Sequence, residues 1–114
     1  MTRWHASLAG RFGAFPKHQQ ILMVANELNR ASNLRDNARE YAHALERALE
    51  LLDLLCADPR WKPALRELRR GREVLAALYL NPQPLLLPIL QRTLIQLDAQ
   101  AWKMLLPRPK SAQK

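Results

Sequence analysis

Residues 36–58, DNAREYAHALERALELLDLLCAD, decide the fold of this chain. Within this stretch, apolar side chains recur at alternating spacings of three and four residues, the pattern that forms the seam of a left-handed helix bundle. The seam consists of Ala38, Tyr41, Leu45, Ala48, Leu52 and Leu55. The flanks of the seam are apolar as well, with Ala42, Leu49 and Cys56 on one side and Ala44 and Leu51 on the other. Because one neighbour cannot cover so wide an apolar face, the sequence predicts a central helix that contacts two or three others.

The ends of this central helix are marked by capping and breaking residues. Asp36 or Asn37 can cap its start, and Glu40 follows Asn37 by three residues, as in a capping box. Pro59 follows the stretch directly, and the residue before a proline avoids helical geometry. The helix is therefore expected to lie within residues 36–58.

Two segments are expected before the central helix. A helix from Pro16 to Ser32 is predicted by a second apolar seam, and Pro16 suits its first turn. This seam consists of Ile21, Val24, Leu28 and Ala31. Further upstream, residues 2–15 carry Trp4, Leu8, Phe12 and Phe15 at helical spacing. Gly10 and Gly13 weaken that pattern, so a short or frayed helix is expected there.

A third helix is expected from Pro59 or Pro63 to Leu80, and two apolar registers compete within it. One register consists of Trp61, Leu65, Leu68, Arg72, Leu75 and Tyr79, and it would bury the guanidinium of Arg72. The other consists of Ala64, Leu68, Gly71, Leu75 and Leu78, and it leaves Arg72 on the flank with its charged end in water. The second register is favoured because burying an unpaired charge is costly. Gly71 is then expected where two helices approach closely.

The last helix is predicted to begin near Pro84 or Pro88 and to end before Pro107. If it begins at Pro84, Pro88 should kink it. Its seam consists of Leu87, Leu90, Leu94, Leu97, Ala101 and Met104. Residues 107–114 are rich in proline and basic side chains and are expected to be disordered.

Four seamed helices with short connections predict an all-α fold, specifically an antiparallel, left-handed, up-down four-helix bundle with a short extra N-terminal helix. The 114 residues suffice for a single domain with its own core, which we assign to residues 1–106, followed by a basic flexible tail at 107–114. The side chains expected to be buried are Leu28, Tyr41, Leu45, Leu52, Leu68, Leu75, Leu90, Leu94 and Leu97.

The composition and net charge of the chain indicate its cellular compartment and the kind of partner it binds. The single cysteine rules out an internal disulfide, argues against a zinc site and fits a cytoplasmic protein. No apolar run reaches the roughly 18 residues of a membrane-spanning helix, so no membrane partner is expected. The formal net charge is +8, with 13 arginines and 5 lysines, which indicates an acidic partner such as RNA, DNA or an acidic protein surface.

Basic residues are concentrated between positions 60 and 72, where Glu67 is the one acidic side chain. Arginine is well suited to phosphate because its planar fork can bind two oxygens at once. In an up-down bundle, the loop near Pro59 lies at the same end as Lys17, His18 and the C-terminal tail, so basic residues of the tail should gather beside it. The predicted nucleic-acid-binding residues are Arg60, Lys62, Arg66, Arg69, Arg70, Lys103, Arg108 and Lys110. The alternative is a charged face that is merely solvated.

The residues of the chain give little indication of catalysis. Arg11 and His18 resemble a motif of helical-bundle ribonucleases of the HEPN group. In that motif an arginine is followed, after four to six residues, by a histidine, and Arg11 and His18 have this spacing. About one such match is expected by chance in this composition, and Pro16 lies inside it. Cys56 follows the apolar flank of the central helix and is interpreted as a small buried hydrophobe. We therefore assign no catalytic residue, metal or cofactor.

A second apolar stripe on the last helix indicates self-association. Ile95, Ala99, Trp102 and Leu106 lie away from the main seam of that helix. The N-terminal segment could cover this stripe within the same chain, or a second copy could cover it, because contiguous exposed apolar patches usually have an occupant. A homo-oligomer is favoured, with an interface built from Trp4, Leu8, Phe12, Ile95, Trp102 and Leu106.

The sequence thus predicts a non-catalytic, small, basic helical accessory or adaptor protein that binds nucleic acid through phosphate contacts. One alternative is a protein-interaction or self-assembly module whose charge is incidental, and a second is a HEPN-like ribonuclease. Salt dependence separates the first two hypotheses, because binding to phosphates weakens steeply as the salt concentration rises.

Overall fold

The computed structural model describes residues 11–105, and over this range the protein is helical and contains no β-strand. The predicted all-α fold is therefore confirmed. The α-helices are α2 (Lys17–Asn33), α3 (Ala38–Ala57), α4 (Leu65–Leu80), α5 (Leu87–Ile95) and α6 (Ala99–Leu105). Two short 3₁₀ helices, η1 (Pro59–Ala64) and η2 (Pro84–Leu86), precede α4 and α5.

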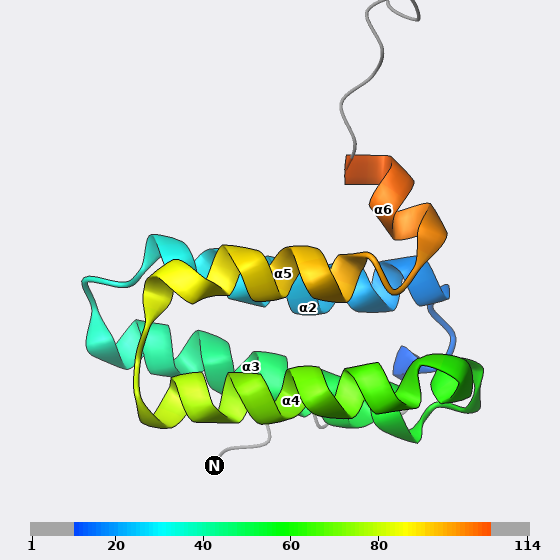
Figure 1. Cartoon of the computed structure of the whole chain (residues 1–114), viewed down its shortest axis with the longest axis horizontal. Helices are drawn as coiled ribbons and strands as arrows, with labels where there is room; N and C mark the ends of the chain where they lie inside the picture. The colour runs from blue at the N-terminus through cyan, green and yellow to red at the C-terminus, as the bar shows by residue number, and fades with distance from the viewer. Residues whose placement is uncertain (1–10, 106–114) are drawn as a thin grey trace, which may run out of the picture.

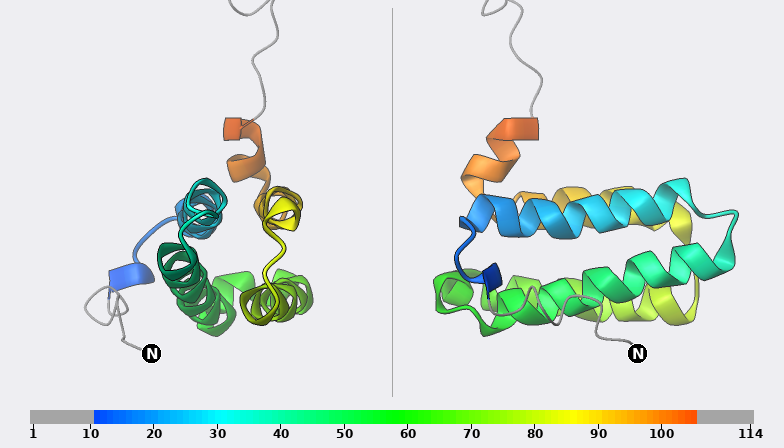
Figure 2. Two further views of the ribbon diagram at one scale, coloured as in Figure 1. Left: turned by 90° about the vertical axis from the view of Figure 1, so that its left-hand side faces the viewer. Right: turned by 180° about the vertical axis from the view of Figure 1, so that it is seen from behind.

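Four of these helices run along the length of the molecule in two layers (Figures 1 and 2). Helices α2 and α5 lie side by side in one layer, and α3 and α4 lie side by side in the other. The layers are joined most closely where α2 packs on α3, whereas α4 and α5 contact each other sparsely. Helix α6 contacts α2 and α5 and points away from the rest of the molecule (Figure 1).

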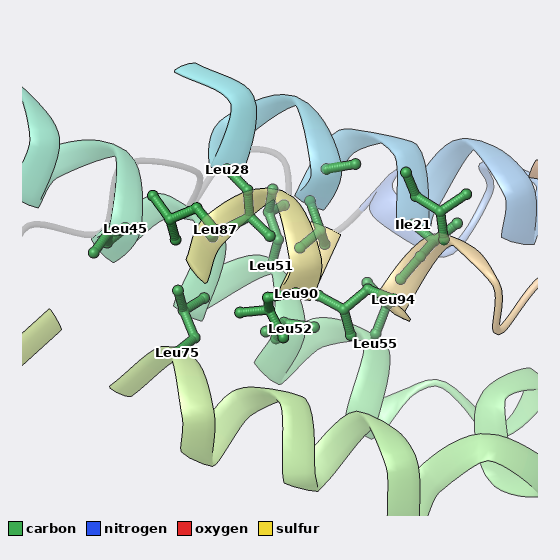
Figure 3. Packing of buried hydrophobic residues seen from close by; sticks show 14 of the residues in the cluster. Ile21, Leu28, Leu45, Leu51, Leu52, Leu55, Leu75, Leu87, Leu90 and Leu94 are labelled. Atoms are coloured by element: carbon green, nitrogen blue, oxygen red, sulfur yellow. The ribbon is translucent and has the colours of Figure 1, made fainter. Parts of the chain in front are cut away.

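The core lies between the two layers and is dominated by leucine (Figure 3). Helix α3 contributes most to it, and Leu45 and Leu52 are fully buried, as expected for a central helix. Of the nine side chains predicted to be buried, all are buried except Leu97, which is half-buried. Leu97 is less covered because the chain turns at that point.

The predicted start and end of the central helix agree with the structure. Asn37 is the residue before α3, and its side-chain oxygen accepts a hydrogen bond from the backbone N–H of Glu40 at 3.2 Å. This is the contact expected of an N-terminal cap. Helix α3 ends at Ala57, and Asp58 before Pro59 is extended.

Polar side chains of α3 bind its neighbours on both sides. The buried carboxylate of Glu27 on α2 accepts a hydrogen bond from Nε of Arg47 at 3.1 Å. On the other side, the hydroxyl of Tyr79 on α4 donates to the carboxylate of Glu46 at 2.6 Å, which raises the pKa of Tyr79. The polar face of α3 therefore fixes its register against both α2 and α4.

Helix α4 adopts the register that the sequence favours. Leu68, Gly71, Leu75 and Leu78 are buried, and Arg72 lies at the flank. A methyl group on Gly71 would come within 2.8 Å of a terminal methyl of Leu94 on α5, so glycine allows this close approach without a shift of the Leu94 side chain.

Trp61 is also fully buried, although it belongs to the register that buries Arg72, which the sequence disfavours. The reason is that Trp61 lies in the 3₁₀ helix η1, which has about three residues per turn, so the α-helical register of α4 does not extend back to it.

The prediction of one continuous last helix is wrong. Helix α5 ends at Ile95, the chain turns at Gln96–Asp98, and α6 begins at Ala99. The carboxylate of Asp98 accepts a hydrogen bond from the backbone N–H of Ala101 at 2.9 Å, so Asp98 caps a new helix. Met104, which the continuous seam would bury, is exposed.

A buried glutamine joins three segments at the end where α2 begins. Gln20 is fully buried, and its Nε2 donates to the carbonyl oxygen of Phe12 at 2.9 Å and to the carboxylate of Asp58 at 3.2 Å. Its Oε1 accepts a hydrogen bond from the indole Nε1 of Trp61 at 2.7 Å. The ammonium of Lys17 lies 4.7 Å from the centre of the Trp61 ring, a cation–π distance. This junction fixes η1, and with it the start of α4, against α2.

The predicted N-terminal helix lies largely outside the described residues. Arg11 and Phe12 are helical, a turn follows, and α2 begins at Lys17. The expected flexible tail at 107–114 is also outside the described residues. Within residues 11–105, no helix has both the length and the apolarity needed to cross a bilayer.

Candidate nucleic-acid interface on helix α4

The outward side of α4 carries the arginine cluster that the sequence predicts. Arg66, Arg69, Arg70 and Glu73 follow the spacing of residues on one helical face, and all four are exposed. The opposite side of the helix is anchored in the core by Leu68 and other buried residues. We call Arg66, Arg69 and Arg70 the arginine face of α4.

The arginine face has no carboxylate partner among residues 11–104, since none of its three guanidinium groups forms an ion pair or a side-chain hydrogen bond there. Arg72, on the α3 side of the same helix, differs because it forms a two-pronged ion pair with Asp53. This pair raises the pKa of Arg72. The arginine face is therefore available to an external anion, whereas Arg72 is already used within the fold.

A hollow of about 740 Å³ lies among the side chains of the arginine face. All the residues that line it belong to α4, including Glu67 and Glu73. A hollow bounded by one convex helix is the space between splayed side chains, so it does not enclose a small molecule. Glu67 and Glu73 reduce the positive charge of this hollow.

Arg60, also predicted to bind nucleic acid, is exposed but forms hydrogen bonds within the fold. Its guanidinium donates to the carboxylate of Asp58 at 2.8 Å and to the carbonyl oxygen of Gly13 at 2.8 Å. These contacts link η1 to the segment before α2. Hydrogen bonds from Arg60 hold the pKa of Asp58 well below its usual range. The neighbouring Lys62 is exposed, so it can extend the arginine face toward η1.

The remaining basic residues are spread more widely than the sequence suggests. Lys17 lies beside η1 as expected, through its contact with Trp61. Lys103 is exposed on α6, on the α2–α5 side of the molecule and across from η1 (Figures 1 and 2). Arg108 and Lys110 lie outside the described residues. The structure therefore brings together Arg66, Arg69 and Arg70 and places Lys103 apart from them.

The sequence raised Arg11, His18 and Cys56 as residues that could serve catalysis. Arg11 and His18 lie on two segments separated by the turn that precedes Pro16. Burial and the charge of Asp53 raise the pKa of the Cys56 thiol, which favours its unreactive form. Residues 11–105 contain no group of three His, Cys, Asp or Glu side chains positioned to hold a metal ion.

The residues predicted to form an oligomer interface differ in how far they are buried within the chain. Phe12 and Ile95 are buried within one chain, and Phe12 packs edge-on against Phe15 with ring centres 6.0 Å apart. Trp102 is half-buried against the core. Trp4, Leu8 and Leu106 lie outside the described residues. The turn at Gln96–Asp98 interrupts the stripe because it separates Ile95 from Trp102.

Two features were not predicted from the sequence. One is the set of hydrogen bonds around Gln20, because a single glutamine in an amphipathic helix does not indicate that it is buried or what it contacts. The other is an apolar groove between α4 and α5. Ile89 lines this groove, but its exposure depends on the distance between the two helices, which the sequence does not give. Comparisons of this chain with protein-family models, curated proteins and solved structures gave no match.

Proposed function

We propose that this protein is a non-catalytic accessory or adaptor that binds nucleic acid through phosphate contacts on the arginine face of α4. The observation that supports this function is the exposure of Arg66, Arg69 and Arg70 on one helical face without a carboxylate partner among residues 11–104. Each guanidinium can bind two phosphate oxygens. The net charge of +8 adds a long-range attraction for polyanions.

The chemistry of the arginine face indicates the mode of binding. The hollow on this face is lined by charged side chains and Leu65, with no aromatic residue on which a base could stack. Phosphate contacts fix the position of a protein on a nucleic acid but carry no direct sequence information. We therefore expect recognition of the backbone with little sequence preference, and we do not expect the stacking mode of single-strand binders.

Two charge-matched double variants test this function. Arg66→Gln with Arg70→Gln removes two charges from the arginine face, and Arg35→Gln with Arg39→Gln removes two exposed charges near the start of α3. Fluorescence anisotropy with a labelled RNA hairpin and a labelled DNA duplex at low salt should show a large loss of affinity for the first variant and a small loss for the second. Equal losses would mean that net charge alone drives binding, and no binding by the wild type would reject the function.

The connectivity of the bundle and the cellular compartment are two further proposals. We propose that α2, α3, α4 and α5 form an antiparallel up-down bundle, because short connections join each helix to the next. We further propose that the protein acts in the cytoplasm, where its half-buried Cys56 would remain reduced.

A further inference from the structure

An open apolar groove is lined by residues of α4, η2 and α5 and of the turn after α5. Helices α4 and α5 are the two that lie toward the viewer in Figure 1. The volume of the groove is about 360 Å³, and its lining is almost entirely apolar. Gly71, Leu90 and Leu94 form its floor where the two helices approach most closely. The groove follows from the sparse packing of α4 on α5, since each of these helices packs mainly on another neighbour.

Several large apolar side chains that line this groove are exposed to water. Ile89 is 63% exposed, and Val74 and Leu86 are 42% and 41% exposed. All three line the groove, Val74 from α4, Ile89 from α5 and Leu86 from η2 just before it. A contiguous set of exposed apolar side chains on a small protein marks a surface that another molecule covers.

The α4 border of the groove carries positive charge. Arg70 lines the groove and also belongs to the arginine face, and Arg66 lies one turn before it on the same helix. Arg92 does not line the groove, but it is exposed on α5 three residues after Ile89. Glu67 is the one acidic residue in the lining. An occupant therefore needs an apolar stripe for the floor and negative charge beside that stripe.

We propose that the groove between α4 and α5 binds an amphipathic helix of a partner protein whose apolar stripe is flanked by glutamate or aspartate. A groove between two helices accepts the side-chain ridge of a third helix, and such helices are read through apolar residues about one turn apart. A second copy of this chain, packed symmetrically on the same groove, would bring Arg70 against Arg70. A nucleic acid would leave the apolar floor unfilled.

A synthetic peptide tests this proposal against the full-length protein. The probe is a fluorescein-labelled amphipathic helix with leucines at helical spacing on one side and glutamates beside them. A matched peptide carries lysine in place of every glutamate. The glutamate peptide should bind the wild type saturably with one peptide per chain, and the lysine peptide should bind far more weakly.

Two substitutions that leave the net charge unchanged distinguish binding in the groove from non-specific electrostatic attraction of the peptide. Ile89→Asn alters the groove, whereas Leu80→Asn alters a leucine that is 82% exposed and lies outside the groove lining. Ile89→Asn should weaken binding of the glutamate peptide by about tenfold, equivalent to roughly 1.4 kcal/mol. Leu80→Asn should leave the affinity unchanged. Both variants keep the net charge, so binding of RNA to the arginine face should be unaffected by either, and failure of one proposal does not imply failure of the other.

Each other outcome overturns the proposal. Equal binding of the glutamate peptide by the wild type and Ile89→Asn would show attraction by charge alone. A wild-type dimer that Ile89→Asn converts to a monomer in sedimentation would place a second copy in the groove. Loss of RNA affinity in Ile89→Asn would place nucleic acid there. No binding of the peptide, together with a marked loss of stability in Ile89→Asn, would mean that another part of the same chain fills the groove.

Discussion

The hydrogen bond between Gln20 and Trp61 offers a quantitative test of how η1 is held against α2. Gln20→Met keeps the length of the side chain but removes the acceptor for the indole N–H of the fully buried Trp61. The other partners of Gln20 keep a second contact, since the carbonyl oxygen of Phe12 also accepts from the backbone N–H of Phe15 and Asp58 remains bonded to Arg60. The cost is therefore mainly that of one orphaned buried donor, about 1–3 kcal/mol of unfolding free energy.

A double-mutant cycle isolates this contact from the loss of packing. Trp61→Phe removes the donor and part of the buried ring, so it should cost more than Gln20→Met alone. In the double variant neither partner is left unpaired, so its cost should be smaller than the sum of the single costs by about 1–3 kcal/mol. Urea melts followed by circular dichroism measure all four proteins. A coupling below about 0.5 kcal/mol would refute the claim that this hydrogen bond holds the junction.

Core packing, acid pH and self-association give three further tests. Leu52→Ala should lower the unfolding free energy by about 2–5 kcal/mol in a denaturant melt, because Leu52 is fully buried in the central helix; a loss below about 0.5 kcal/mol would mean that α3 is not central. The lowered pKa of Asp58 means that its carboxylate stabilises the fold fully above about pH 5 and less as the pH falls below its usual titration range. Asp58→Asn should therefore make the urea midpoint less dependent on acid pH, and an unchanged dependence would contradict the role of Arg60. The apolar stripe in the sequence leads us to propose that the half-buried Trp102 contributes to a homo-oligomer interface, although Phe12 and Ile95 are buried within one chain; Trp102→Glu should then reduce self-association in analytical ultracentrifugation, whereas a wild type that stays monomeric at high concentration would reject a homo-oligomer.

Helix positions were largely predictable because the apolar seams extend over many residues. Helix α3 was predicted well since its seam, its Asn37 cap and Pro59 all indicate the same boundaries. The break before α6 was missed because the apolar spacing continues through residues 94–101, while the interruption depends on one local cap at Asp98. A short capping contact can therefore end a helix that the long-range pattern extends.

The candidate site was predictable in part for a different reason. Arg66, Arg69 and Arg70 could be placed on one face from their spacing alone. The contact of Arg60 with Gly13 could not, because Gly13 lies 47 residues away in the sequence, whereas its other partner, Asp58, is a near neighbour in the sequence. The groove was not predictable from periodicity, since the exposure of Ile89 depends on the separation of α4 from α5.

The most direct test of phosphate binding on α4 is the salt dependence of nucleic-acid affinity. The association constant for a DNA duplex is measured by anisotropy over a range of salt concentrations for the wild type and for the double variant Arg66→Gln with Arg70→Gln. Each lost phosphate contact reduces the slope of log K against log salt by about 0.9. If Arg66 and Arg70 each contact a phosphate, the slope of the double variant is shallower by nearly 2, while Arg35→Gln with Arg39→Gln keeps the slope of the wild type. Parallel lines for the wild type and the α4 variant would contradict phosphate binding by Arg66 and Arg70.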